Sequence, residues 1–200
     1  VERENQLKLI ELVRSLSEEC NTVVMSGSLP KGVRPEFYGE VLSNVPSRVK
    51  VIVDTEKENM ESALSCGHEI FLVKPNLREL EKFTGYTVKR KSDAVKAASV
   101  YLDRGVKNVL ISLGEDGAIL TDGKDNFYCK SASVAVNSTV GAGDCMVAAV
   151  CVGLERGLPI REILKMSVAA GTASITTSGT NLFYKDKYDE IYSKIFVEDI

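Results

Sequence analysis

Residues Ser138–Asp144 read Ser-Thr-Val-Gly-Ala-Gly-Asp, and the apolar run Cys-Met-Val-Ala-Ala-Val follows at 145–150. The two glycines allow a tight turn and let a ligand approach the backbone closely. A helix that begins here has unpaired N–H groups at its positive end, where anions, phosphate above all, bind. Asp144 would lie in the first turn, where a carboxylate could accept a proton from an attacking hydroxyl while the N–H groups stabilise a transferring phosphoryl group. The stretch alone is equally typical of a glycine turn with an acid at a favourable helix start.

Short apolar runs alternate with helical stretches along the rest of the chain. Strands are predicted at 22–26, 50–54, 70–73 and 107–113, and helices at 3–19, 34–45, 57–65 and 92–104. No strand has the period-two pattern of a sheet with one solvated face, so we expect a parallel sheet covered by helices on both sides. Two later strands, 118–121 and 127–129, follow tight turns and are expected to be antiparallel. Further helices are predicted directly behind Asp144 and at 160–173 and 186–198.

The composition is that of one globular domain. The chain has 200 residues, of which 44% are apolar and 26% are charged, and a net charge of −3. The small negative charge argues against a nucleic-acid partner, since surfaces that bind nucleic acids are basic. No apolar run approaches the roughly 20 residues that span a bilayer, and the first residues lack signal-peptide character. We therefore expect no nucleic-acid or membrane partner.

Five cysteines are scattered through the chain without Cys-x-x-Cys spacing. This pattern is neither a disulfide framework nor a zinc site, and it favours a cytoplasmic location. The only histidine, His68, lies in a predicted turn. Mechanisms that pair a nucleophile with a histidine base are therefore disfavoured.

Three further loops follow predicted strands. Residues 27–32 read Gly-Ser-Leu-Pro-Lys-Gly, 76–79 read Asn-Leu-Arg-Glu, and 114–117 read Gly-Glu-Asp-Gly. The first could be only a strand-to-helix connection and the last only a hairpin turn. Asn76 and Glu79 have the spacing of a capping box, in which Asn76 accepts from the helix N–H groups and Glu79 reaches back to the cap. Glu79 could bind a metal ion through water at the same time.

These four segments, in this order, resemble the motifs of the ribokinase-like (PfkB) sugar kinases. The C-terminal signature of that family is usually Asp-Thr-x-Gly-Ala-Gly-Asp, and Ser138 stands here in place of the first Asp. The resemblance implies a ribokinase-like three-layer α/β/α fold with a mostly parallel sheet. It also implies that Gly141, Ala142 and Gly143 form an anion hole and that Asp144 is the catalytic base.

The resemblance further implies ATP and Mg²⁺ as cofactors. Glu79 is the residue associated with magnesium. The candidates for cofactor binding are Asn76, Ser112, Gly114, Gly117, Thr139 and Gly179. Gly179 belongs to the hydroxyl-rich stretch 172–180, whose counterpart in the family helps to wall the adenine and ribose pocket.

The resemblance covers nearly the whole chain, yet members of the family are usually about half as long again. It implies that the part not represented is N-terminal and comprises the first strands of the sheet, a small β lid and most of the sugar-binding residues. We therefore expect residues 1–200 to form a single nucleotide-binding α/β domain, the C-terminal portion of such a kinase, with an open sheet edge. For the full-length protein we expect a phosphosugar and ATP as partners, and a homodimer stays open.

The implied activity is ATP-dependent phosphorylation of a phosphorylated ketohexose. The Gly-Ser-Leu-Pro loop and residues 136–144, Val-Asn-Ser-Thr-Val-Gly-Ala-Gly-Asp, are most similar to those of the fructose 1-phosphate kinases of the family, which make fructose 1,6-bisphosphate. Tagatose 6-phosphate and fructose 6-phosphate are the alternative acceptors. A function of a different class also stays open, in which these 200 residues bind a nucleotide without turnover.

Overall fold

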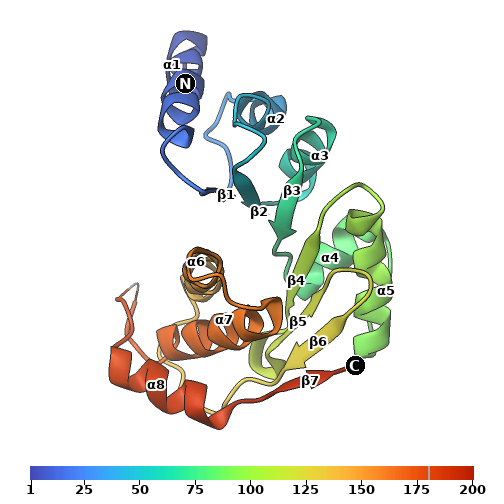
Figure 1. Cartoon of the computed structure of the whole chain (residues 1–200), viewed down its shortest axis with the longest axis vertical. Coiled ribbons are helices and arrows are strands. Elements are labelled where there is room, and N and C mark those ends of the chain that lie inside the picture. Colours follow the sequence, from blue (N-terminus) through green and yellow to red (C-terminus); the bar gives the residue numbers. More distant parts are fainter. Residues whose placement is uncertain (180) are drawn as a thin grey trace.

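Within the residues that the structure describes, seven strands form one mixed sheet in which each strand lies beside its neighbours in the sequence (Figure 1). The coordinates are a computed structural model that describes residues 1–179 and 181–200. The strands are β1 (Thr22–Ser26), β2 (Lys50–Asp54), β3 (Ile70–Val73), β4 (Asn108–Ser112), β5 (Ala118–Thr121), β6 (Asn126–Cys129) and β7 (Val197–Asp199).

The first four strands are parallel, and the helices that connect them lie on one face of the sheet. Parallel neighbours are joined by right-handed crossovers, so strands in sequential order place every crossover helix on the same face. These helices are α2 (Glu36–Leu42), α3 (Lys57–Ser65), α4 (Leu77–Thr84) and α5 (Lys91–Leu102), and α1 (Arg3–Ser17) precedes β1.

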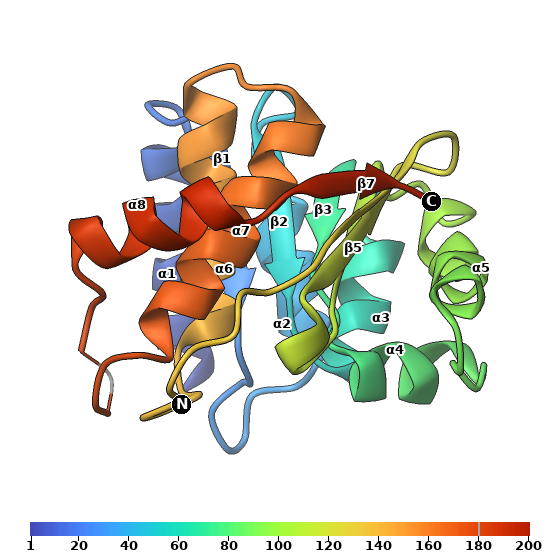
Figure 2. The ribbon, with the colours of Figure 1, turned by 90° about the horizontal axis from the view of Figure 1, so that it is seen from below.

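Each of the last four strands, β4 to β7, is antiparallel to its neighbour within this group. The tight 3₁₀ turn Gly114–Asp116 joins β4 to β5. The chain then crosses to the other face, which is covered by α6 (Ala142–Glu155), α7 (Ile160–Ser174) and α8 (Lys185–Lys194) (Figure 2). The predicted three-layer α/β/α architecture, with a mostly parallel sheet that finishes in antiparallel strands, is confirmed.

Alternate residues of the central strands fill two separate cores. In β2, Val51 and Val53 pack against α2 and α3, while Ile52 packs on the opposite face under α6 and α7. All three are fully buried. Because successive side chains of a strand point to opposite faces, burial on both sides explains the unbroken apolar runs in the sequence.

The predicted closing helix at 186–198 is too long. Helix α8 ends at Lys194, and Val197–Asp199 form β7 beside β6. Ile195 is buried at the end of the helix, and the chain then extends so that its backbone pairs with Phe127–Cys129. That pairing partner lies far away in the sequence, so local periodicity could not reveal the strand.

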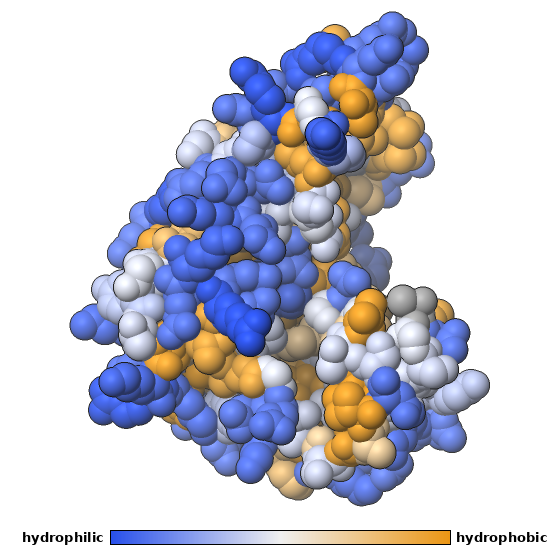
Figure 3. Space-filling model, turned by 180° about the vertical axis from the view of Figure 1, so that it is seen from behind, coloured by the Kyte–Doolittle hydropathy of each residue, from blue (hydrophilic) through white to orange (hydrophobic). Residues whose placement is uncertain are grey.

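Strand β1 forms one of the two edges of the sheet in the described part of the chain. Strand β1 has a partner only on its β2 side within the described chain, and it contains no charged residue. Helix α1 exposes Leu9, Leu12 and Leu16, and Figure 3 shows apolar residues gathered on the upper part of the molecule, where Figure 1 places α1. An unprotected edge of this kind favours association.

Among the described helices, none combines the length and the apolar character that crossing a bilayer requires.

Replacing Gly153 on α6 by alanine tests the close contact between α6 and α7. A Cβ at this position would lie 2.6 Å from Ile163 Cγ1 on α7. At an exposed helical site, Gly→Ala stabilises by about 0.5–1 kcal/mol, but overpacking a core costs about 1–3 kcal/mol. We expect Gly153→Ala to lower the free energy of unfolding, measured by urea denaturation, by about 1 kcal/mol or more.

The double variant Gly153→Ala/Ile163→Ala provides the control. Removing the Ile163 side chain makes room for the new methyl group. The losses of unfolding free energy in the single variants Gly153→Ala and Ile163→Ala should therefore sum to more than the loss in the double variant. A Gly153→Ala chain that is as stable as the wild type would contradict the close packing.

Candidate functional site

The predicted helix start is confirmed, and it lies at the carboxyl edge of the parallel strands. Gly141 is the N-cap residue of α6, with a φ of 82° that only glycine adopts easily. Ala142, Gly143 and Asp144 then form the first turn. The Asp144 side chain is exposed. The first turn of α6 separates two cavities.

The first of these, which we name the glycine-loop cavity, has a volume of about 690 Å³. It brings together seven of the predicted site residues: Asn76, Ser112, Gly114, Gly117, Thr139, Ala142 and Gly143. Apolar side chains complete its wall, among them Val136, Met146, Val168 and Ile175. A cavity with an apolar wall and a few polar groups at one end is typical of a small-molecule site.

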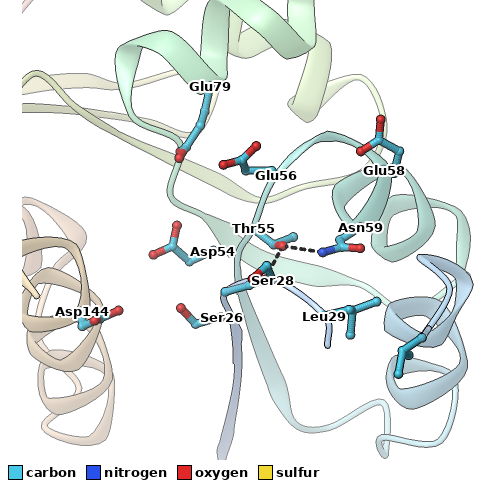
Figure 4. Close-up of a pocket in the computed structure, with 12 residues that line it drawn as sticks. Ser26, Ser28, Leu29, Asp54, Thr55, Glu56, Glu58, Asn59, Glu79 and Asp144 are labelled. Carbon is cyan, nitrogen blue, oxygen red and sulfur yellow. Dashed lines mark hydrogen bonds between the residues drawn. The ribbon is translucent and has the colours of Figure 1, made fainter. Parts of the chain in front are cut away.

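The second, which we name the acidic cavity, has a volume of about 620 Å³. Five carboxylates line it: Asp54, Glu56, Glu58, Glu79 and Asp144. Figure 4 shows Asp144 projecting from α6 on one side, with Thr55, Asn59 and Leu29 on the other. Ser26, Gly27 and Ser28 complete this side of the cavity. Predicted residues Glu79 and Asp144 therefore share a cavity, and it is not the one that the glycine loop lines.

A buried ion pair, which the sequence reasoning missed, lies between the ends of β2 and β3. Lys74 Nζ is 3.1 Å from Asp54 Oδ2, and the two side chains are 6% and 15% exposed. A Cβ at Gly143 would lie 3.0 Å from the same Nζ atom. The ammonium group therefore reaches the first turn of α6 because residue 143 has no side chain. The sequence signal for this pair was a charged residue at the carboxyl end of each of two neighbouring parallel strands, since ligand sites lie at that edge of an α/β sheet.

On balance, the surroundings of Asp54 disfavour the ionised form of its carboxyl group. Burial raises the pKa of Asp54 above its ordinary value, the Lys74 ammonium opposes this shift, and the nearby Asp144 carboxylate adds to it. A carboxylate so placed depends on its cation partner, because an unpaired buried charge is costly.

The start of α6 offers amide donors to an anion. The Ala142 N–H donates to the Thr139 carbonyl across a long 3.4 Å contact. The N–H groups of Gly143 and Asp144 have no acceptor within the described part of the chain. Two free donors at a helix N-terminus, next to the Lys74 ammonium, make the local potential positive, which is the kind of environment that anions prefer.

The capping box at the start of α4 is confirmed. The Glu79 N–H donates to Asn76 Oδ1 across 2.9 Å, and the Asn76 N–H donates to Glu79 Oε2 across 2.8 Å. Asn76 lines the glycine-loop cavity while Glu79 lines the acidic cavity. Within the described residues, no three Asp, Glu, His or Cys side chains come together as a complete metal site. The role of Glu79 toward a metal ion stays a prediction.

The 114–117 loop packs against residues of β6. Gly117 has a φ of 90°, and a Cβ there would lie 2.0 Å from the Cys129 carbonyl oxygen. The Tyr128 hydroxyl donates to the Asp116 carbonyl across 2.8 Å. The predicted hairpin turn is therefore confirmed, and its backbone is fixed at the rim of the glycine-loop cavity.

Gly179 is not among the described residues that line the two cavities. It lies in the loop after α7, with a φ of 61°. Thr180, the last residue of the hydroxyl-rich stretch, lies outside the described residues. Thr172 of that stretch does line the glycine-loop cavity.

Comparison with known families matches residues 2–187 to the pfkB family carbohydrate kinases. The chain is 32% identical over 198 residues to the 1-phosphofructokinase of Borreliella burgdorferi, a match that covers 98% of this chain and 63% of that protein. It is 36% identical over 173 residues to the ATP-dependent 6-phosphofructokinase isozyme 2 of Escherichia coli, covering 86% of this chain and 56% of that protein.

The fold is also that of a solved kinase. The structure of phosphofructokinase-2 from Escherichia coli in complex with fructose-6-phosphate superposes with a TM-score of 0.84 at 31% identity, covering 97% of this chain and 62% of that chain. The chain thus spans less than two thirds of the length of each of these three relatives.

Replacing Lys74 tests the buried ion pair. Lys74→Met leaves the Asp54 carboxylate buried without its cation, which costs about 3–5 kcal/mol when the charge must persist. The folded-state pKa of Asp54 already lies above its ordinary value of 3.8. Asp54 therefore contributes less to the free energy of unfolding as the pH rises from the ordinary pKa to the raised folded-state pKa. Losing Lys74 raises the pKa further. We therefore expect a larger loss of unfolding free energy at pH 7 than at pH 4, measured by urea denaturation.

Lys82→Met is the matched control. Lys82 pairs with Glu56 across 3.3 Å, but the two side chains are 60% and 69% exposed. Such a surface pair contributes at most about 1 kcal/mol. Equal losses for Lys74→Met at the two pH values would show that Asp54 is not the group responsible.

Proposed function

The chain belongs to the pfkB family of carbohydrate kinases, and on that premise we propose that it transfers the γ-phosphoryl group of ATP to a hydroxyl of a phosphorylated ketohexose. The observation that carries the proposal is the position of Asp144. Its carboxylate projects from the first turn of α6 into the acidic cavity, while Ala142 and Gly143 of the same turn line the glycine-loop cavity. A donor and an acceptor bound in the two cavities would meet at this turn.

ATP would occupy the glycine-loop cavity. Its apolar wall suits a nucleobase, and the free amides of Gly143 and Asp144 lie at the end where phosphates would gather. Asn76 and Ser112 would contribute polar contacts, since both line the same cavity. The Lys74 ammonium adds a cation beside Gly143.

Asp144 would act as the general base. As the γ-phosphoryl group transfers, the acceptor hydroxyl loses its proton, and the exposed carboxylate of Asp144 can take it. The helix amides and Lys74 would stabilise the charge on the transferring group, because fixed donors need no reorganisation during the reaction. Phosphoryl transfer depends mainly on such positioning and charge stabilisation.

The residues around Glu79 fit a magnesium ion. Mg²⁺ is commonly held by one or two carboxylates together with substrate phosphates and water. Asp54 and Glu79 line one cavity, and only the Oε2 oxygen of Glu79 is engaged in the capping box. Such an ion, when bound, supplies charge neutralisation at the nucleotide phosphates.

The acceptor would lie in the acidic cavity. Ser26 and Ser28 offer hydroxyl groups, and Asn59 offers its amide oxygen, to sugar hydroxyls. No lysine or arginine is among the described lining residues, so the acceptor's own phosphate has no cation partner there. We expect affinity for the phosphosugar to be weaker than affinity for the nucleotide in these 200 residues.

Fructose 1-phosphate is the proposed acceptor. The relatives with similar sequences are named 1-phosphofructokinase and 6-phosphofructokinase, which supports a ketohexose phosphate. The test is a coupled assay of ADP release with fructose 1-phosphate, fructose 6-phosphate and tagatose 6-phosphate in parallel. The highest kcat/KM should belong to fructose 1-phosphate; ADP binding without turnover on any of the three would favour the non-catalytic alternative.

A homodimer and a cytoplasmic location also stay proposals. The exposed Leu9, Leu12 and Leu16 on α1 support association. The five free cysteines support a reducing compartment.

Replacing the proposed base tests its role. Asp144→Asn keeps the size of the side chain but cannot take the proton, and a general base contributes about 10²–10⁴-fold to the rate. We expect kcat in the coupled assay to fall by that factor while the ADP dissociation constant, measured by calorimetry, stays within about twofold. Turnover close to the wild-type rate would remove Asp144 from the mechanism.

The variant Glu79→Gln distinguishes the capping role of Glu79 from its proposed role as a magnesium ligand. Glutamine retains most of a capping box, so the melting temperature should change little. Loss of the charge should raise the magnesium concentration needed for half-maximal ADP affinity or turnover. Glu58→Gln, an exposed carboxylate of the same cavity, is the matched control and should leave the magnesium requirement unchanged. A lower melting temperature with an unchanged magnesium requirement would leave Glu79 as a cap alone.

A further inference from the structure

Three hydrogen bonds converge on Gly27, at the end of β1. The Gly27 N–H donates to the Asp54 carbonyl across 2.9 Å. The Gly27 carbonyl accepts from the Tyr38 hydroxyl and from the Thr55 hydroxyl, each across 2.6 Å. A carbonyl oxygen has two lone pairs, so both of its acceptor positions are filled. The backbone of this one residue is therefore fixed from both sides.

The two hydroxyl donors are themselves held in place. Tyr38 on α2 is 3% exposed and packs in the core beside β2. Thr55 accepts a hydrogen bond from Asn59 Nδ2 across 3.1 Å, as Figure 4 shows. Because that bond occupies a lone pair of the Thr55 oxygen, it favours the rotamer in which the hydroxyl hydrogen points to Gly27.

The segment beyond Gly27 has two further contacts: Leu29 packs half-buried against the core, and the Val33 N–H donates to the Pro30 carbonyl across 3.1 Å. Gly27 and Gly32 have φ values of 89° and 88°, and Ser28, Pro30 and Lys31 are exposed. Glycine in such a conformation loses much freedom on ordering. The segment nevertheless forms one side of the acidic cavity through Gly27, Ser28 and Leu29. The hydrogen bonds at Gly27 fix the backbone where this segment begins, and Leu29 anchors its other end.

We propose that Tyr38 and Thr55 are positioning residues that fix the Gly27–Leu29 segment on the far side of the acidic cavity from Asp144, and so set the affinity for the acceptor. The link to the acceptor rests on the proposed function; the fixing of the segment does not. Neither hydroxyl needs to touch the sugar. A site held to within a fraction of an ångström binds better than the same groups on a mobile loop.

The first experiment measures amide hydrogen exchange of Gly27 by NMR in the 200-residue chain without any ligand. The variants are Tyr38→Phe, which keeps the buried ring, and Thr55→Val, which keeps the shape of the side chain. Each should speed exchange of the Gly27 amide about two- to tenfold, and the double variant should speed it more than either. Thr55→Ser, which restores the hydroxyl, should return exchange toward the wild-type rate.

Tyr192→Phe on α8, away from both cavities, is the matched control and should leave the Gly27 amide unchanged. Exchange in the core strand β4 should be the same in all variants, which separates loosening of the segment from loss of global stability. Unchanged exchange at Gly27 in the double variant would overturn the proposal.

The second experiment measures dissociation constants for fructose 1-phosphate and for ADP with magnesium on the same proteins. Weakening of at least threefold for fructose 1-phosphate, with ADP within about twofold, supports the proposal. Faster exchange without any change in fructose 1-phosphate affinity would overturn the link to the acceptor. A wild-type chain that binds ADP but none of the three phosphosugars would count against the proposed function instead, and the exchange data would still decide whether Tyr38 and Thr55 fix the segment.

Discussion

A buried ion pair between Lys74 and Asp54 is the interaction on which the candidate site depends. It joins the ends of β2 and β3 and brings an ammonium group against Gly143, in the first turn of α6. Each charge is tolerable in this setting only because the other is present. The absence of a side chain at Gly143 allows the helix to begin at the ion pair, so one glycine links the sheet edge, the helix and their charges.

The order of the strands explains why the site forms at this edge. Sequential parallel strands place their crossover helices on one face and leave the other face to α6 and α7, which follow the antiparallel strands. Helix α6 therefore arrives with its N-terminus at the carboxyl ends of β2 and β3. Open α/β sheets bind ligands at this edge. The free amides of α6 and the Lys74 ammonium lie at this turn, and the carboxylates of the acidic cavity lie beyond it.

Local signals in the sequence predicted most of the fold and part of the site. Apolar runs located the strands, glycines located the start of α6, and the Asn76–Glu79 spacing located a capping box. Contacts between distant segments could not be predicted in this way. Strand β7 depends on pairing with β6, and the Lys74–Asp54 pair depends on the register of two strands.

The same limit applies to the hydroxyl donors at Gly27. The sequence predicted only that Tyr38 belongs to a helix. Its hydroxyl donates to the Gly27 carbonyl because the tertiary fold brings α2 to the end of β1. The most direct test of the account is NMR chemical-shift mapping with ADP–Mg²⁺ and, separately, fructose 1-phosphate. ADP should shift the amides of Ser112 and Gly114, the sugar should shift Ser28, and both ligands should shift Asp144. Shifts at Ser28 with ADP alone, or none at Asp144 with either ligand, would contradict it.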